Sequence, residues 1–429
     1  MSRTRPFKIA IVGGGLGGLA LAIGLHRRGV PIHVYESAPE FSEIGAGLTF
    51  ATNAIRALGL IDPDLVVGFR KHFKKNPPGF FMNIRFAVNP KPGNEGQNDY
   101  KMGDLLYELR DEEECGYIHR ARLLEVMVGL LPPNLCSFRK TLVDIEELSR
   151  AEGDGVNLVF SDGTNAKADA VIGCDGIKSL TRAKIAGKEI PPRFTGDVVY
   201  RHMFPIETVV EALGEERAHV PHLLFSYGTV MVHYPVGDGS MVNMVAIHAT
   251  GADEWEGGGD WVKPVSKEKV LGALKDWDPA ILRLMSGMPD FKEWALFDCA
   301  HGEKYYRGRL CILGDAAHAA TPHNGGGAGM AMEDAYALSQ VISRVSNAHE
   351  LEYAFEIYDS IRRQRTQRFV HNGRSSGKTW QLRDDYAKDV PSKLKEQLDA
   401  KFKWIWYHDL KAETDQALAQ ISFGKGASL

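Results

Sequence analysis

The sequence predicts an α/β protein in which a parallel-sheet domain is interrupted by an antiparallel β-sheet domain and followed by C-terminal helices. Three observations predict this order. A strand, a glycine-rich turn, a helix and a second strand follow one another before residue 36. Apolar and polar residues alternate with the period of a β-strand over residues 196–248. A buried strand returns at 310–313, and long charged helices follow it.

The first unit has a β-α-β pattern. Phe7–Val12 is short, apolar and β-branched, which predicts a buried strand. Leu19–Arg28 carries apolar residues at helical spacing, and Gly29 ends this helix. Pro31–Tyr35 is the second predicted strand. Two such strands joined by a helix predict a parallel sheet with helices packed on it.

The turn between the first strand and the helix contains G-x-G-x-x-G at Gly13, Gly15 and Gly18. Gly13 permits the tight turn, Gly15 lets the backbone approach a pyrophosphate, and Gly18 lets the helix lie close to the sheet. Glu36 ends the second strand, where a carboxylate can accept hydrogen bonds from both ribose hydroxyls. This Rossmann-like pattern favours an unphosphorylated adenosine ribose, as in NAD or FAD.

The middle of the chain changes its pattern. Residues between Gly196 and His248 alternate as in an antiparallel sheet, with a turn at Gly237–Gly239. Before it, we expect loops and short strands, one helix and two further strands, at Val66–Glu112, Arg120–Leu131, Val156–Phe160 and Ala170–Cys174.

A second glycine-rich turn distinguishes between NAD and FAD, the two candidate dinucleotides. The strand Leu310–Leu313 leads into Gly314-Asp315, and a glycine run then opens the helix Ala328–Val345. A flavin needs a polar partner for its ribityl chain and hydrogen-bond donors at its N1–C2=O edge, and a glycine turn at a helix N-terminus supplies such donors. NAD needs neither group. The predicted flavin-binding residues here are Gly314, Asp315, Pro322, Gly326, Gly327 and Ala328.

The composition excludes several other classes. The formal net charge is −4, with charges of both signs dispersed, which gives no surface for nucleic acid. No apolar stretch is long enough to span a membrane, and the first eight residues do not resemble a signal peptide. Five cysteines at unrelated spacings favour a reducing, cytoplasmic location and argue against a disulfide framework or a metal site.

These motifs together resemble the class A flavoprotein monooxygenases. The resemblance rests on the first glycine turn with Glu36, on Gly314-Asp315 followed by TPHNGGGAG, and on Glu333-Asp334-Ala335. The tail Lys403–Leu410 is similar to fungal salicylate hydroxylase-like members. Three further segments match the family and add cofactor-binding residues: Ile44–Gly47 adds Gly47, His119–Leu124 adds Arg120, and Ala168–Ser179 adds Asp175.

The resemblance implies a catalytic cycle. NADH or NADPH reduces FAD and leaves, and the reduced flavin takes up O2 to form a C4a-hydroperoxide that hydroxylates a small, phenolic aromatic substrate. The implied substrates are salicylate, a related hydroxybenzoate or a phenolic polyketide. Because the chain carries a single dinucleotide fingerprint, we expect NAD(P)H to bind transiently across a cleft. Such an oxidant survives only where water is excluded, so the pocket should be mostly apolar.

The substrate-binding residues are sought in the antiparallel segment and beside the flavin turn. A phenol becomes nucleophilic when its hydroxyl proton is lost or shared. Arg201 is the expected anion and phenolate binder, and Tyr234 is its expected hydrogen-bond partner; a surface ion pair for Arg201 and a core position for Tyr234 are the alternatives. His323 is a candidate base, whereas His318 fits a buried structural histidine better.

Two other functions remain open at this point. One is a flavoprotein oxidase or epoxidase that acts on a non-phenolic metabolite, and the other is an FAD-binding scaffold without activity. A monomer and a homodimer fit the sequence equally. The expected domains are an FAD-binding domain, a substrate domain and a C-terminal helical segment: 1–75 with 105–185 and 296–365; 76–104 with 186–295; and 366–429.

Overall fold

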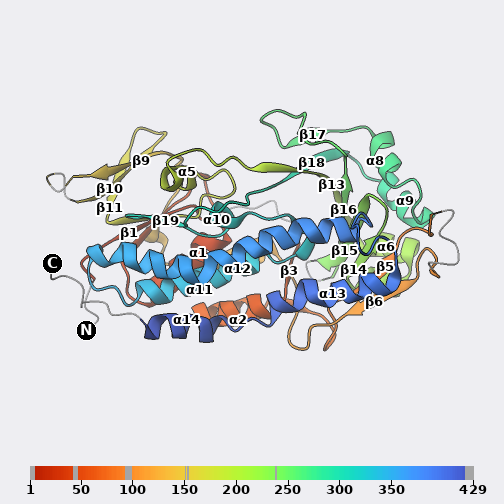
Figure 1. Ribbon diagram of the computed structural model, residues 1–429, viewed down its shortest axis with the longest axis horizontal. Helices are drawn as coiled ribbons and strands as arrows, with labels where there is room; N and C mark the ends of the chain where they lie inside the picture. Colours follow the sequence, from red (N-terminus) through yellow and green to blue (C-terminus); the bar gives the residue numbers. More distant parts are fainter. Residues whose placement is uncertain are drawn as a thin grey trace.

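The computed structural model describes residues 5–41, 47–91, 99–149, 151, 154–236 and 239–420. The described chain forms a parallel-sheet half and an antiparallel-sheet half that lie end to end (Figure 1). This arrangement confirms the predicted fold class. Part of the predicted turn at 237–239 and of the segment Ile44–Gly47 lies outside the described residues.

The parallel-sheet half is built on six strands in the order β19-β20-β12-β1-β2-β8. All neighbours pair in parallel except β19 and β20. The strand bounds are β1 Ile9–Val12, β2 Ile32–Tyr35, β8 Cys136–Ser137, β12 Ala170–Gly173, β19 Tyr306–Arg307 and β20 Leu310–Ile312. Strands from the first third and from the last third of the sequence therefore lie in one sheet. β12, from the middle third, lies between β1 and β20.

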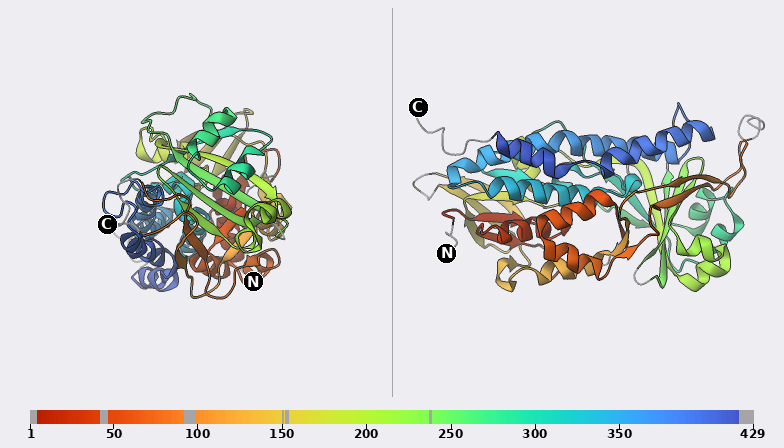
Figure 2. Two further views of the ribbon diagram at one scale, coloured as in Figure 1. Left: turned by 90° about the vertical axis from the view of Figure 1, so that its right-hand side faces the viewer. Right: turned by 90° about the horizontal axis from the view of Figure 1, so that it is seen from below.

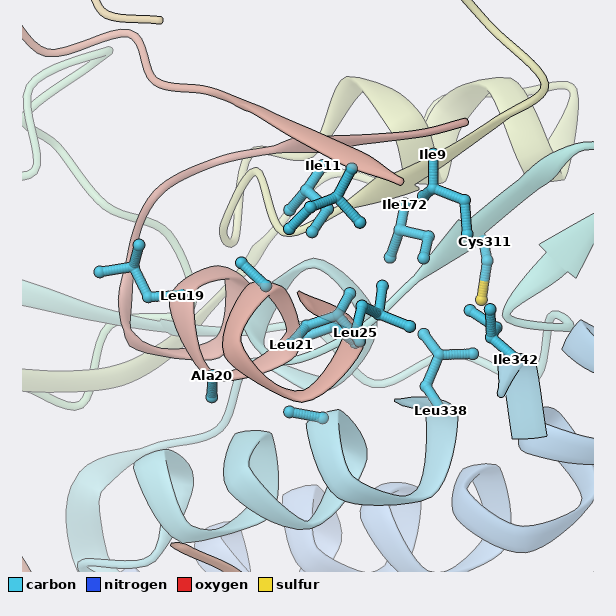
Figure 3. Packing of buried hydrophobic residues seen from close by; sticks show 14 of the residues in the cluster. Ile9, Ile11, Leu19, Ala20, Leu21, Leu25, Ile172, Cys311, Leu338 and Ile342 are labelled. Carbon is cyan, nitrogen blue, oxygen red and sulfur yellow. The ribbon is translucent and has the colours of Figure 1, made fainter. Parts of the chain in front are cut away.

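Helices α1 (Leu16–Arg27) and α11 (Gly327–Ile342) pack one on the other beneath this sheet. Figure 3 shows Leu21 and Leu25 of α1 between the strand residues Ile11 and Ile172 and residue Leu338 of α11. Gly24 of α1 allows this approach, because a Cβ there would lie 2.9 Å from the side chain of Ser339. The two glycine turns that open α1 and α11 therefore face the same end of the sheet.

The other half contains an eight-stranded sheet in the order β17-β18-β13-β16-β15-β14-β5-β6. It is antiparallel except for β14 and β5, which pair in parallel. The strand bounds are β5 Met82–Phe86, β6 Leu105–Leu109, β13 Arg193–Pro205, β14 His222–Phe225, β15 Thr229–Val236, β16 Met241–Ala249, β17 Val262–Pro264 and β18 Lys292–Asp298. Its outer face carries α6 Ile206–Leu213, α7 Glu215–His219, α8 Lys267–Ala273 and α9 Pro279–Ser286 (Figure 2).

Three C-terminal helices connect the halves. α12 (Leu351–Trp380) runs along α11 and continues to the inner face of the eight-stranded sheet, where α13 (Pro391–Trp406) joins it (Figures 1 and 2). α14 (Leu410–Ala419) returns to the parallel-sheet half. Apolar residues of α12 and α13 form one buried cluster with Leu223, Val230 and Ile247 of the sheet.

The remaining described elements complete the parallel-sheet half. Val156–Phe160 and Ala170–Cys174, both expected as strands, belong to two different sheets, because β10 pairs only with β9 and β11. The other bounds are β3 Gly47–Phe50, β4 Lys74–Lys75, β7 Gly116–His119, β9 Leu142–Leu148, β10 Gly155–Phe160, β11 Asn165–Ala168, α2 Thr52–Ile61, α3 Pro63–Arg70, α4 Arg120–Gly129, α5 Leu180–Ala186, α10 Asp315–His318, η1 Pro133–Leu135, η3 Pro322–Asn324 and η4 Ala348–Glu350.

The segment Val66–Glu112 is more regular than expected. α3 occupies its start, because the Asp62 side chain caps the helix at Asp64 N and Pro63 stands at the first helical position. β5 and β6 then join the eight-stranded sheet, although the expected domain boundary separates them at residue 105. Across the described part of the chain, no helix has the length and apolar character needed to cross a membrane.

Candidate active site

A cavity of about 460 Å³ lies where the two halves meet. The two glycine turns and Arg120 line one part of it, together with Cys174 and Gly176. The inner face of the eight-stranded sheet, the turn 320–324 and two aromatic residues of the C-terminal helices line the other part: Phe81, Met82, Leu223, Val230, Val232, Tyr234, Val245, Ile247, Trp380 and Phe402. One part of the cavity thus offers backbone and charged groups, and the other is mostly apolar.

The first glycine turn has the geometry that the sequence predicts. Gly13 has φ +103°, and a Cβ there would lie 2.2 Å from the carbonyl oxygen of Cys174. A Cβ at Gly18 would lie 2.0 Å from the carbonyl oxygen of Gly13, so neither position accepts a side chain. A Cβ at Gly15 would meet nothing within 4 Å, and Gly15 lines the cavity. The open space at Gly15 is where a pyrophosphate can approach the N-terminus of α1.

Glu36 holds the first turn from outside the cavity. Its Oε2 accepts a hydrogen bond from Gly14 N at 2.6 Å, and its Oε1 accepts one from Ala38 N at 2.8 Å. The carboxylate stands directly after β2, beside the first turn. Its position is compatible with the predicted ribose contact, which stays a prediction.

The second glycine turn is fixed by a buried acid. Gly314 has φ +61°, and its N–H donates to Asp334 Oδ2 at 3.0 Å. The same carboxylate oxygen lies 2.5 Å from His318 Nε2, so His318 supports the turn from behind. His318 does not line the cavity, whereas Gly314 and the exposed Asp315 do. The structural interpretation of His318 therefore agrees with the geometry.

The start of α11 forms the rest of this turn. Pro322, Gly325, Gly326, Gly327 and Ala328 all line the cavity. Gly325 has φ +60°, and α11 begins at Gly327 without a capping side chain. A Cβ at Gly327 would meet nothing within 4 Å. The N–H groups of this first helical turn therefore face open space that suits an anionic or carbonyl oxygen.

Three further predicted cofactor-binding residues occupy different places. Arg120 lines the cavity, and burial lowers its pKa, an effect that the negative charge of Asp315 partly offsets. Gly47 also lines the cavity and is packed against β15. Asp175 does not line it: its carboxylate accepts hydrogen bonds from Ser179 Oγ and from the backbone N of Thr181. Asp175 thus shapes the start of α5, while its neighbour Gly176 faces the cavity.

Tyr234 reaches the cavity from β15. Its hydroxyl donates to the carbonyl oxygen of Gly47 at 2.8 Å and accepts from Asn243 Nδ2 at 3.0 Å. Burial raises the pKa of Tyr234. The neighbouring His233 points to the opposite face, as strand alternation requires, and stacks on His222 with ring centroids 4.9 Å apart.

Arg201 lies on the same sheet face as the cavity but does not line it. It is exposed, its guanidinium lies over the ring of Trp294 at 4.9 Å, and its register partner Val245 is a cavity residue. Its charge acts on Tyr234 and lowers the pKa of that phenol against the larger effect of burial. The structure therefore places Arg201 beside the pocket wall, and its predicted substrate contact stays a prediction.

The turn Thr321–Asn324 supplies the polar groups of the apolar part. His323 is 7% exposed, lines the cavity, and has no hydrogen-bond partner at either ring nitrogen among the described residues. Burial lowers its pKa to about 4, so the ring is neutral at pH 7. Thr321 Oγ1 and both amide atoms of Asn324 are likewise buried without a described partner.

Sequence reasoning missed several residues of this pocket, among them Thr321, Asn324, Trp380 and Phe402. Thr321 and Asn324 stand in the TPHN tetrapeptide beside His323, so their place next to the flavin turn was a usable signal. Trp380 and Phe402 carried no such signal. They reach the cavity only because α12 and α13 return from the C-terminus to the inner face of the sheet.

The combined geometry fits FAD. Two helix N-termini with side-chain-free turns face one cavity, as a pyrophosphate and a flavin ring edge require, and a partly apolar chamber adjoins them. This class of site defines a flavoprotein that acts on a small molecule bound beside the flavin. A nucleotide site of this kind with a single fingerprint excludes the two-Rossmann arrangement.

Comparison with known proteins agrees with this class. Residues 144–373 match the family model described as FAD binding domain, and residues 11–52 match the NAD(P)-binding Rossmann-like domain. The chain is 34% identical to a 6-methylsalicylate 1-monooxygenase from Aspergillus terreus over 97% of this chain and 93% of that protein. It is 31% identical to a salicylate hydroxylase from Pseudomonas putida over 98% and 96%.

A solved salicylate hydroxylase substrate complex has the same fold. It superposes with a TM-score of 0.82 at 27% identity and covers 96% of this chain and 98% of that one. The chain belongs to the family of FAD-dependent monooxygenases of the salicylate hydroxylase type. This membership confirms the predicted family and the predicted cofactor FAD.

Proposed function

We propose that this protein uses NAD(P)H and O2 to hydroxylate a phenolic aromatic ring, such as salicylate, a related hydroxybenzoate or a phenolic polyketide. The observation that carries the proposal is the mixed character of one cavity. Its flavin part has two glycine turns, and its other part is a buried apolar chamber with neutral polar groups at one edge. The names of the relatives from Aspergillus terreus and Pseudomonas putida support a salicylate-like ring.

The chain's own residues give the chamber its chemistry. The aliphatic side chains of β14–β16 and the rings of Trp380 and Phe402 bind a flat ring and exclude water. His323 lines the cavity, stays neutral at pH 7, and has no hydrogen-bond partner at either ring nitrogen among the described residues, so it is our candidate to accept a hydrogen bond from the hydroxyl of a bound phenol. Tyr234, whose hydroxyl is held by Gly47 and Asn243, also lines the cavity.

Arg201 is proposed to act on the phenol as it ionises. Its guanidinium already influences Tyr234 from beside the wall, and a positive charge there stabilises a phenolate that forms in a low-dielectric chamber. Bound FAD would supply reduction by NAD(P)H and activation of O2, with Gly15, Arg120, Asp315 and the N-terminus of α11 as the residues that hold it.

A substrate panel tests the proposal. Hydroxybenzoates, including salicylate, and resorcinol aldehydes are incubated with the holoenzyme, NADH or NADPH and air, and both NAD(P)H oxidation and hydroxylated product are measured. We expect at least one phenol to accelerate NAD(P)H oxidation with product formed in a near-equal amount. NAD(P)H oxidation that no phenol accelerates, or that yields only peroxide throughout the panel, would contradict the proposal and favour an oxidase.

A further inference from the structure

α12 approaches the polar turn of the pocket through two glycines one helical turn apart. A Cβ at Gly373 would lie 2.8 Å from Thr321 Oγ1. A Cβ at Gly377 would lie 2.7 Å from Cε1, 2.9 Å from Nε2 and 3.1 Å from Nδ1 of His323. Side chains do not make Cβ contacts shorter than about 3.0 Å, because dispersion attraction gives way to steep repulsion there. The imidazole of His323 therefore occupies the space that a side chain at Gly377 would need.

α12 cannot retreat from this contact. On one side of it, Arg365 is paired with Glu333 of α11 in a buried, two-bond arrangement. Beside Gly373, Arg374 is paired with Asp298 at the end of β18. Beyond Gly377, Trp380 Nε1 donates to the carbonyl oxygen of His323 at 3.2 Å. A side chain added at Gly377 would therefore move the imidazole and not the helix.

Packing alone fixes the ring of His323. Neither of its nitrogens has a hydrogen-bond partner within the described ranges, and the residue is 7% exposed and lines the cavity. An imidazole without partners has no hydrogen bond to define its rotamer, so its neighbours must do so. Gly377 of α12 is one such neighbour, because a Cβ there would overlap the ring.

We propose that Gly377 is a positioning residue: its missing side chain leaves room for the imidazole of His323 against α12, so that the ring keeps its place in the cavity wall. This inference rests on the proposed function for its kinetic consequence, but not for its geometry. Gly373 does the same for Thr321, so α12 holds two polar residues of the turn in place.

The test compares Gly377→Ala with Gly272→Ala. Both changes add a methyl group to a helix, but a Cβ at Gly272 in α8 would meet nothing within 4 Å. The His323 ring is followed by NMR of ¹³Cε1-labelled histidine in the FAD-bound protein, and its signal is assigned by its loss in His323→Ala. This measurement needs no substrate, so it stays informative if no phenol proves active.

We expect Gly377→Ala to shift the His323 signal and to raise its titration midpoint from about 4 towards 6.5, since the displaced ring loses burial. Phenol-stimulated flavin reduction should fall by about 10- to 100-fold, the cost of misplacing a reactive group by about an ångström. FAD content should stay the same, and Gly272→Ala should match the wild type. An unmoved histidine signal, or a rate within about twofold of the wild type, overturns the proposal.

A double-mutant cycle separates positioning from general packing. If Gly377 acts through the His323 ring, adding Gly377→Ala to His323→Ala should change phenol affinity and melting temperature no further. An equal loss in both backgrounds overturns the proposal. If Gly377→Ala alone fails to fold, recovery of folding in the His323→Ala background supports the proposal, and failure in both backgrounds contradicts it.

Discussion

Single residues with similar burial have different roles here because they face different sides of one sheet. His323 and His233 are both buried, and both lack a described hydrogen-bond partner at either ring nitrogen. His323 belongs to the turn 322–324 and lines the cavity. His233 faces the helices on the outer side of the sheet and is stacked on His222, so it stays a structural residue. Its unpaired nitrogens reduce the stability of the fold.

For Arg201, we predict a loss of catalysis without a loss of cofactor. In Arg201→Ala, FAD should stay bound, because no flavin-turn residue contacts this side chain in the described structure, where Arg201 lies over Trp294. Phenol-stimulated flavin reduction should fall by about tenfold or more, as for the loss of one charge that stabilises a developing anion. Stopped-flow reduction of the flavin measures this, with Arg193→Ala at the start of β13 as a control. Unchanged kinetics would remove Arg201 from the site.

For the His222 and His233 pair, we predict acid sensitivity of the fold. Burial lowers the pKa of His222 from 6.5 to about 4 and the pKa of His233 well below 6.5. Between the lowered pKa values of the folded chain and 6.5, the unfolded chain binds more protons than the folded chain. The free energy of unfolding therefore has its full value above about pH 6.5 and decreases as the pH falls below it. By pH 5 the two histidines should together cost about 4 kcal/mol, about 2 kcal/mol each.

The variant His233→Leu tests this prediction. It removes two ring nitrogens that have no partner in the described chain and keeps an apolar side chain of similar reach. We expect the melting temperature of His233→Leu to fall less than that of the wild type between pH 7.5 and pH 5. An equal fall in both proteins would assign the acid sensitivity to other groups.

At the scale of elements, the contact of α11 with α12 carries the largest buried charge network. Arg362 pairs with Glu333 and Asp334, and Arg365 pairs with Glu333. Burial alone would raise the pKa values of both acids, but His318 and Arg362 beside Asp334, and Arg362 and Arg365 beside Glu333, outweigh it and hold each pKa at about 2. Because Asp334 also accepts from Gly314 N, the network fixes the flavin turn as well as the helix pair.

For this network, we predict that Arg362→Leu destabilises the protein and weakens FAD binding. The change leaves Asp334 and Glu333 buried with one cation fewer, which costs about 3–5 kcal/mol. The adjacent Arg363→Leu is the matched control, because Arg363 is 38% exposed and its pair with Asp359 is worth less than about 1 kcal/mol. Urea unfolding and FAD titration measure the two effects, and equal behaviour of the two variants would contradict the prediction.

At the scale of the whole molecule, two glycine turns far apart in sequence meet at one cavity. The parallel sheet places β1 and β20 on either side of β12, so the turn after β1 that opens α1 and the Gly314 turn after β20 that opens α10 lie at the same end of the sheet. The glycine run that opens α11 lines the same cavity. α12 then extends to the second sheet and closes the chamber with Trp380. The cofactor site and the substrate chamber therefore depend on the same helix.

For the first turn, we predict that Gly15→Val gives a folded but colourless protein. Gly15 has φ −69° and ψ −178°, which valine adopts without strain, and its Cβ meets nothing within 4 Å of the protein. The side chain would instead fill the space expected for the pyrophosphate. The absorbance at 450 nm of the purified variant should be near zero with a cooperative melting transition retained. Gly259→Val, at an open surface turn, should stay yellow; a yellow Gly15→Val would contradict the placement of FAD.

The features of this protein that depend on local geometry could be predicted from its sequence. Gly13 and Gly18 predicted the first turn because only glycine fits a backbone with positive φ or a contact below 3 Å, and Gly15 predicted the open space beside it. The alternation over 196–248 predicted the antiparallel strands, and Tyr234 was correctly separated from His233 by strand periodicity. The family motifs predicted FAD, because their glycine turns leave backbone N–H groups open to a pyrophosphate and to a flavin ring edge.

Which side chains from distant parts of the sequence share the chamber could be seen only in the folded structure. Trp380 and Phe402 line the pocket, and Gly377 approaches His323, because α12 and α13 cross between the halves, and no local pattern encodes such a crossing. The position of Arg201 over Trp294 was equally hidden, since strand periodicity gives the face of a residue but not its distance from a cavity. Contacts between residues far apart in sequence are set by packing of the whole core, which periodicity and motif spacing do not specify.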